Sequence, residues 1–132
     1  MRKITPDKEK SKSLLKMAEK SLERLKETDK KKYPSQTLRD YYDILRQLME
    51  GLASLEGVKS QGKGAHKKLI DWVCEEYNLK ESERHFLQKI RKYRNRIEYE
   101  GFSIDFSYLE RNETRIDDMI QIFKEKLRER VY

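Results

Sequence analysis

Apolar residues recur every three or four positions along most of the 132-residue chain, which is the spacing of one helix face. This periodicity predicts five helices, at about residues 6–26, 34–57, 65–77, 82–101 and 108–130. Thr5 is the expected N-cap of the first helix and Pro6 its first helical residue. The central stripe of apolar positions, in the second predicted helix, is Leu38, Tyr41, Tyr42, Leu45, Leu48, Met49, Leu52 and Leu55.

Breaks between these helices are short, since the chain has only five glycines and two prolines. Residues 57–64 hold three of the glycines, but P-loop spacing and a preceding strand are both lacking, so this is expected to be a plain helix–helix connection. Residues 102–108 form a second short break. We therefore predict one all-α domain over residues 1–132, an antiparallel up-and-down bundle of about five helices, with residues 1–6 as a flexible tail.

Charged residues make up 42% of the chain and apolar residues 36%, and the formal net charge is +7. The charge is uneven, because residues 58–96 carry 11 lysines and arginines against five acidic residues. A basic surface attracts polyanions, chiefly nucleic acid, although a lysine-rich helix face can also serve only to keep a protein in solution.

Side chains that bind metals or form disulfides are scarce. Cys74 is the single cysteine, so we expect a buried small side chain in a reducing cytoplasm. His66 and His85 have no partners at ligand spacing, so we expect no metal ion and no cofactor. No apolar run approaches a membrane-spanning length, which indicates a protein of the cytoplasm with no membrane contact.

The most informative segment is Arg94-Asn95-Arg96-Ile97-Glu98-Tyr99-Glu100-Gly101, at the end of the fourth predicted helix. Tyr99 stands five positions after Arg94, which is roughly 140° around a helix, so the two side chains flank one surface. Arginine, asparagine and a ring-bearing side chain together can hold a phosphate. Lys89, Lys92 and Arg96 are the expected basic residues that attract a nucleic-acid backbone.

On the basis of these and other residues, the chain resembles the HEPN superfamily of small all-helical proteins over about residues 8–130. The likeness is carried by the Tyr41-Tyr42 segment, by Gly64-Ala65-His66 at the start of the third predicted helix, and by the stretch from Arg94 to Tyr99. Many members are metal-independent endoribonucleases, often toxins paired with a minimal nucleotidyltransferase antitoxin, and their motif is Arg-x4-His at a homodimer interface. The resemblance thus implies a homodimer that acts on RNA or a nucleotide.

In that family arginine binds the scissile phosphate and histidine moves protons, so the resemblance assigns catalytic positions to Arg94, Asn95 and Tyr99. Tyr99 stands where the family has histidine, and Glu98-Tyr99 fits a related branch with Arg-x4-Tyr. Tyrosine has a reference pKa of about 10, which makes it a poor general base at neutral pH. Gly101 occupies the place of a tyrosine that is modified in toxin members.

Several alternatives to a ribonuclease stay open at this point. The chain can be a non-catalytic module that binds RNA, a nucleotide or a nucleotidyltransferase, or a purely structural oligomerisation bundle. Arg94 can pair with an acid on a neighbouring helix, and Tyr99 can be a half-buried core ring. His66, near the start of its helix, can reach the site from another element and replace the missing base.

Overall fold

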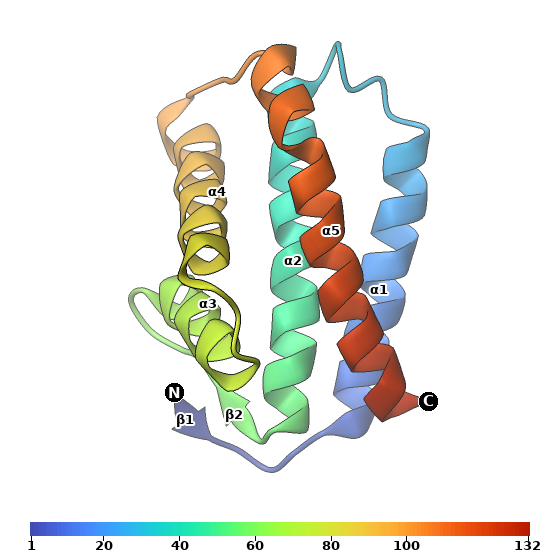
Figure 1. The fold of residues 1–132 in the computed structure, drawn as a ribbon, viewed down its shortest axis with the longest axis vertical. Coiled ribbons are helices and arrows are strands. Elements are labelled where there is room, and N and C mark those ends of the chain that lie inside the picture. Colours follow the sequence, from blue (N-terminus) through green and yellow to red (C-terminus); the bar gives the residue numbers. More distant parts are fainter.

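Five helices make up most of the computed structural model, which describes residues 1–132, the whole chain (Figure 1). They are α1 (Lys8–Lys26), α2 (Pro34–Leu55), α3 (Ala65–Glu76), α4 (Glu81–Glu100) and α5 (Phe106–Val131). The predicted all-α helical bundle is confirmed, and each predicted helix is found with its ends displaced by a few residues at most.

Helix α2 lies at the centre of the bundle and contacts each of the other four helices. Its apolar stripe explains this position, because residues on several sides of the helix are buried, among them Leu38, Tyr42, Leu45 and Leu52. The 26 buried apolar residues form one continuous core, which includes the predicted Cys74. A helix that is apolar over so wide a face is stable only where neighbours cover it from several directions.

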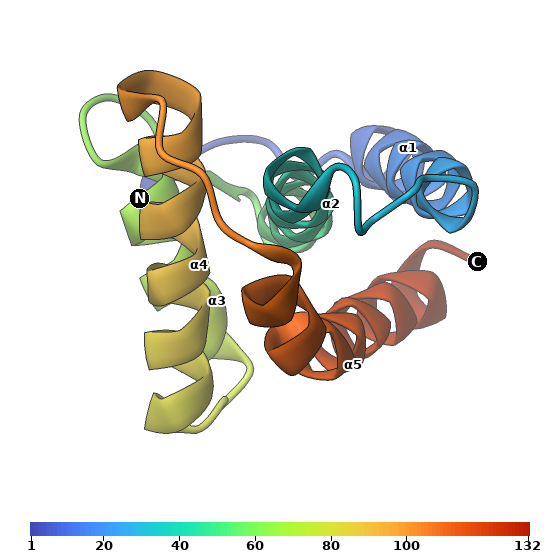
Figure 2. The ribbon, with the colours of Figure 1, turned by 90° about the horizontal axis from the view of Figure 1, so that it is seen from above.

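The helices form two groups. Helices α1, α2 and α5 run lengthwise and pack against one another, whereas α3 and α4 form a hairpin on one side of α2. Seen from above, α4 extends across the direction of α2 rather than along it (Figure 2). The crossed hairpin turns the last half of α4 and the first turn of α3 toward the same side of α2, and this places the candidate site.

The first seven residues differ from the prediction in two ways. Asp7, not Thr5, caps α1, since its carboxylate accepts a hydrogen bond from the Lys10 N–H at 3.0 Å. The segment expected to be a flexible tail contains β1 (Arg2–Lys3), which pairs antiparallel with β2 (Val58–Lys59). The Ile4 N–H also donates to the Gly57 carbonyl at 2.9 Å, so the N-terminal segment is held against the end of α2.

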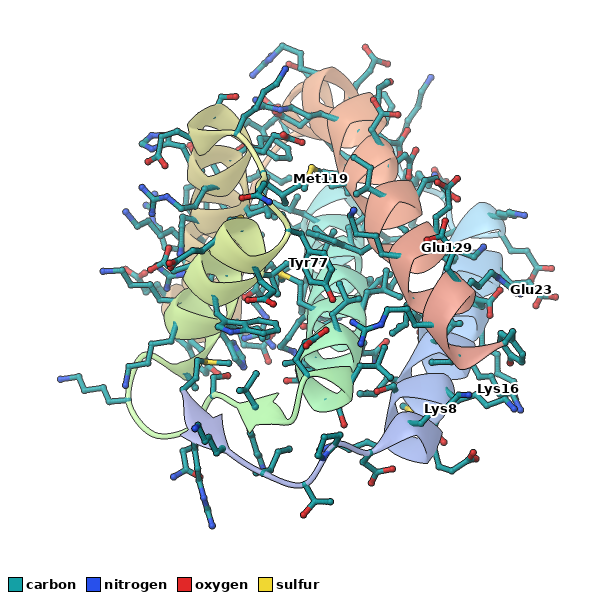
Figure 3. The ribbon with its side chains drawn as sticks, turned by 60° about the horizontal axis from the view of Figure 1, so that its bottom comes forward. Lys8, Lys16, Glu23, Tyr77, Met119 and Glu129 are labelled. Atoms are coloured by element: carbon teal, nitrogen blue, oxygen red, sulfur yellow. The ribbon has the colours of Figure 1, made fainter.

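Charged side chains cover the outside of the bundle. Lys8, Lys16 and Glu23 project from α1 away from the other helices, whereas Met119 on α5 is buried (Figure 3). This division explains how a chain with 42% charged residues still has one core. None of the helices combines the length and the apolar character that crossing a membrane needs.

Candidate functional site

The segment from Arg94 to Tyr99 forms the last turns of α4. Lys80 and Glu83 cap the start of this helix, and the Lys80 N–H donates to the Glu83 carboxylate at 3.2 Å. Gly101 ends it with a φ of 65°, a left-handed conformation that glycine adopts without steric cost, and its N–H donates to the Arg96 carbonyl. The helix therefore holds Arg94, Asn95 and Tyr99 on a rigid element up to its last turn.

These three predicted residues line one pocket of about 260 Å³ between the end of α4 and the start of α3. The other lining residues come from the connection before α3, from its first turn and from the middle of α4: Gly62, Gly64, Ala65, His66, Lys67 and Arg91. Three cations and no carboxylate belong to this lining, so the pocket surface is positively charged. A pocket with this charge suits a phosphate or another anion.

Arg94 is largely enclosed, with 14% of its side chain exposed. One Nη atom lies 3.3 Å from an Asp43 carboxylate oxygen on α2, so the alternative of an ion pair with a neighbouring helix is observed as well. Burial alone would lower the pKa of the guanidinium, but Asp43, with Tyr99 and Glu98 nearby, raises that pKa above its usual value. Arg94 is thus a permanent cation that already has one acidic neighbour.

Four buried side-chain atoms on α2 and α4 make no hydrogen bond within the protein. They are the Tyr42 hydroxyl, Asp43 Oδ1 and Gln47 Oε1 on α2, and Arg94 Nε on α4. Burial also raises the pKa of Tyr42 to about 12, so its hydroxyl keeps the proton. Asp43 Oδ1 nevertheless lies 3.3 Å from an Arg94 Nη atom, so the carboxylate keeps an electrostatic contact with the guanidinium.

His66 lies in the first turn of α3 and is half-buried. Its ring contacts the Tyr42 ring at a centroid distance of 6.2 Å, and its side chain lines the same pocket as Arg94 and Tyr99. Burial lowers the pKa of His66 below its usual range. By contrast, His85 is exposed and lines a different pocket, on the side of α4 that faces α5. The structure thus brings one of the two histidines to the site.

Tyr99 is 75% exposed, so it is not the half-buried core ring that the sequence allowed. Its neighbour Glu98 points to α2, where a carboxylate oxygen lies 3.8 Å from Arg39. A side chain as large and apolar as Tyr99 is rarely left so exposed without a reason, although single exposed aromatics also occur on ordinary surfaces. The phenol ring stands at the open edge of the pocket.

Lys89, Lys92 and Arg96 do not line this pocket. Their spacing of three and four residues places them in one row along α4, beside the pocket-facing row. Lys89 lies over the Tyr93 ring at 6.0 Å, and the Arg96 guanidinium lies 3.8 Å above the Phe102 ring. The predicted basic residues are thus a flanking strip rather than part of the site.

Lys67 and Arg91 occupy the pocket instead, and sequence reasoning did not select them. Arg91 could have been found from its spacing, because it precedes Asn95 by four residues and Asn95 precedes Tyr99 by four. Its Nε donates a 2.7 Å hydrogen bond to Gln88, which fixes the guanidinium on this face. Lys67 carries no such signal, because its place depends on how α3 crosses α4.

No group of three or more histidine, cysteine or acidic side chains lies close enough together to hold a metal ion. Whatever chemistry the pocket supports rests on cations, an amide, a phenol and an imidazole. Comparison with family models, with curated proteins and with solved structures finds no match to this chain.

Proposed function

We propose that this protein acts on single-stranded RNA as a HEPN-type protein, with the pocket at the end of α4 as the site that holds a backbone phosphate. One observation carries the proposal: Arg94, Asn95 and Tyr99 share a pocket with Lys67 and Arg91, and its lining holds no acid. The first three residues are those that the family resemblance selects, and the other two add charge of the sign that a phosphate needs.

In this proposal Arg94 binds the phosphate through its Nη atoms and the Asn95 amide donates a second hydrogen bond. The Tyr99 hydroxyl, at the open edge, contacts the sugar or the leaving oxygen. Lys89, Lys92 and Arg96 flank the site and attract the approaching strand without contacting the reacting phosphate. The protein would then be a metal-independent endoribonuclease of toxin–antitoxin type, or a relative that has kept RNA binding alone.

The pocket is open to solvent along the exposed side of Tyr99. We propose that a second copy of the chain covers this side, as in the homodimers of the family, and that the protein works in the cytoplasm. Dimer formation would enclose the phosphate, lower the local dielectric and strengthen each charged contact.

Arg91→Glu tests the binding site. Reversing a charge in the lining repels the phosphate, so we expect a loss of affinity for a fluorescent 2′-O-methyl RNA oligonucleotide of roughly tenfold or more at ~0.1 M salt. The matched control is Arg115→Glu, which makes the same charge change beside Phe86 and likewise removes a side-chain hydrogen bond, to the Ser82 carbonyl. Fluorescence anisotropy reports both. Equal losses in the two variants would mean general attraction to a basic protein and no phosphate site.

A second candidate function is a non-catalytic module that binds RNA or a nucleotidyltransferase partner. Two observations favour it: Tyr99 stands in place of histidine, and Arg94 already has Asp43 as an ionic partner.

Tyr99→His separates the two candidates. An imidazole exchanges protons near neutral pH far more readily than a phenol, so on a ribonuclease scaffold we expect metal-free cleavage of labelled single-stranded RNA to rise by roughly tenfold or more. The parent and Arg94→Ala proteins, purified in parallel, are the controls. No cleavage by either the parent or Tyr99→His, together with unchanged RNA affinity, favours the binding module.

A further inference from the structure

We infer that His66 is the proton acceptor of this pocket: its imidazole takes the proton of an RNA 2′-hydroxyl while Arg94 and Asn95 hold the adjacent phosphate. This inference rests on the proposed function, and it supplies the base that is missing from the end of α4. It assigns the base to a different helix, α3, which precedes α4 in the chain.

The backbone before α3 places His66 beside the pocket. Gly64 has a φ of 74° and precedes the helix, and the Lys68 N–H donates to the Gly64 carbonyl at 3.0 Å to close the first turn. A β-carbon at Gly62 or Gly64 would meet nothing within 4 Å, and both glycines line the same pocket as His66. A strand of RNA can therefore approach His66 from the loop side without moving the helix.

The Tyr42 ring contacts the imidazole ring of His66. Tyr42 is fully buried on α2, and its ring is tilted by 46° to that of His66 at a centroid distance of 6.2 Å. Its hydroxyl is buried and makes no hydrogen bond within the protein. A rigid aromatic contact of this kind limits the rotation of the imidazole, as proton transfer at a fixed geometry requires.

The charges around His66 favour its neutral form. On α2, Arg46 disfavours the charged form of the imidazole, whereas Glu50 and Asp43 favour it. On α4, Arg94 also disfavours the charged form. Arg91 on α4 and Lys67 on α3 itself add positive charge to the same lining. Burial lowers the pKa of His66 most, and Arg46 and Arg94 lower it further, so the ring is unprotonated at neutral pH and can accept a proton.

The reaction that follows is an internal transfer at phosphorus. The 2′-hydroxyl proton moves to His66, and the 2′ oxygen forms a bond to the adjacent phosphorus as the bond from phosphorus to the 5′ oxygen breaks. The products are a 2′,3′-cyclic phosphate and a 5′-hydroxyl, whose proton comes from Tyr99. The proton on His66 then returns to the Tyr99 oxygen through water. Arg94 balances the charge that develops on the phosphorane oxygens.

His66→Gln tests this assignment, with His85→Gln as the matched control because His85 is exposed in another pocket. The substrate is a 2′-O-methyl oligonucleotide with a single ribonucleotide, and a fully 2′-O-methyl strand measures binding alone. We expect His66→Gln to lose ~100-fold or more of the cleavage rate and to keep its affinity. The control should match the parent protein in both assays.

The pH profile gives an independent readout. The neutral imidazole is the active form, so the cleavage rate of the parent should fall as pH drops through the lowered pKa of His66, below the ordinary histidine value of about 6.5. This acidic limb should be missing from the residual activity of His66→Gln. Histidine NMR signals of the parent should show the same low pKa for His66, and adding the 2′-O-methyl strand should shift His66 but not His85.

The outcomes separate this inference from the proposed function. If the parent protein binds the 2′-O-methyl strand but does not cleave at the ribonucleotide, the RNA site is supported and His66 is not a catalytic base. Undiminished cleavage by His66→Gln, or an NMR signal of His66 that the strand does not move, also overturns the inference. If the parent binds no RNA, the proposed function fails first and His66 has no substrate.

Discussion

Replacing Leu45 with alanine will lower the free energy of unfolding by about 2–5 kcal/mol, which is the usual cost of removing a fully buried leucine side chain. Leu45 has no exposed surface, and it lies on α2, the helix that contacts all four others. The cavity that the alanine leaves cannot close by moving one neighbour, because the walls belong to helices that are also packed elsewhere. Urea unfolding followed by circular dichroism measures the change.

Met17→Ala is the control for this variant. Met17 lies on α1 and is 54% exposed, so its truncation should change the free energy of unfolding by about 0.5 kcal/mol or less. Both substitutions shorten an apolar side chain in the middle of a long helix, which keeps helix propensity comparable. Similar urea midpoints for the two variants would mean that α2 is not the centre of the core.

Apolar periodicity was sufficient to predict the helices because each helix buries one face. The predicted stripe of α2 is buried almost throughout, and on α5 the side chains of Ile116, Ile120 and Phe123 have no exposed surface. The same reasoning predicted the wrong cap for α1, since Thr5 and Asp7 are both good N-caps. The extended backbone of Asp7, with a φ of −133°, decides between them, and composition does not report it.

Two other features of the fold leave no periodic signal. The β1–β2 pair has two residues in each strand, far too few for an alternating pattern, and it joins segments more than fifty residues apart. The crossing of α4 over α2 also cannot be predicted from the sequence pattern. An apolar stripe shows which face of a helix is buried but not the angle at which its partner helix lies.

Some residues of the candidate site could likewise be predicted from the sequence, and others could not. Spacing along one helix predicted that Arg94 and Tyr99 flank one surface, and they do line one pocket. The sequence offered His66 only as an alternative from another element and did not select Lys67, because the approach of both depends on how α3 crosses α4. Lys89 and Arg96 lie outside the pocket lining, on the flanking strip of α4, and their predicted role in attracting a nucleic-acid backbone stays a prediction.

The largest change in RNA affinity is expected for Arg94→Ala. Hydrogen bonds to a charged group contribute about 1.5–3 kcal/mol, so losing the guanidinium should weaken binding of the 2′-O-methyl oligonucleotide by about 10- to 150-fold. The ion pair with Asp43 adds to the loss, because the variant leaves that carboxylate without its cation and close to the incoming phosphate. Fluorescence anisotropy at fixed salt measures the effect.

Asp43→Asn decides between the two roles of Arg94. If the phosphate competes with Asp43 for the guanidinium, removing the carboxylate charge frees Arg94 and strengthens RNA binding. The double variant Arg94→Ala with Asp43→Asn should then bind RNA more tightly than Arg94→Ala alone, because the repelling charge is gone. A structural ion pair behaves differently: Asp43→Asn and Arg94→Ala would both lower the free energy of unfolding, and neither would change RNA affinity. Arg94 Nε makes no hydrogen bond within the protein, so Asp43 engages only part of the guanidinium, through one Nη atom.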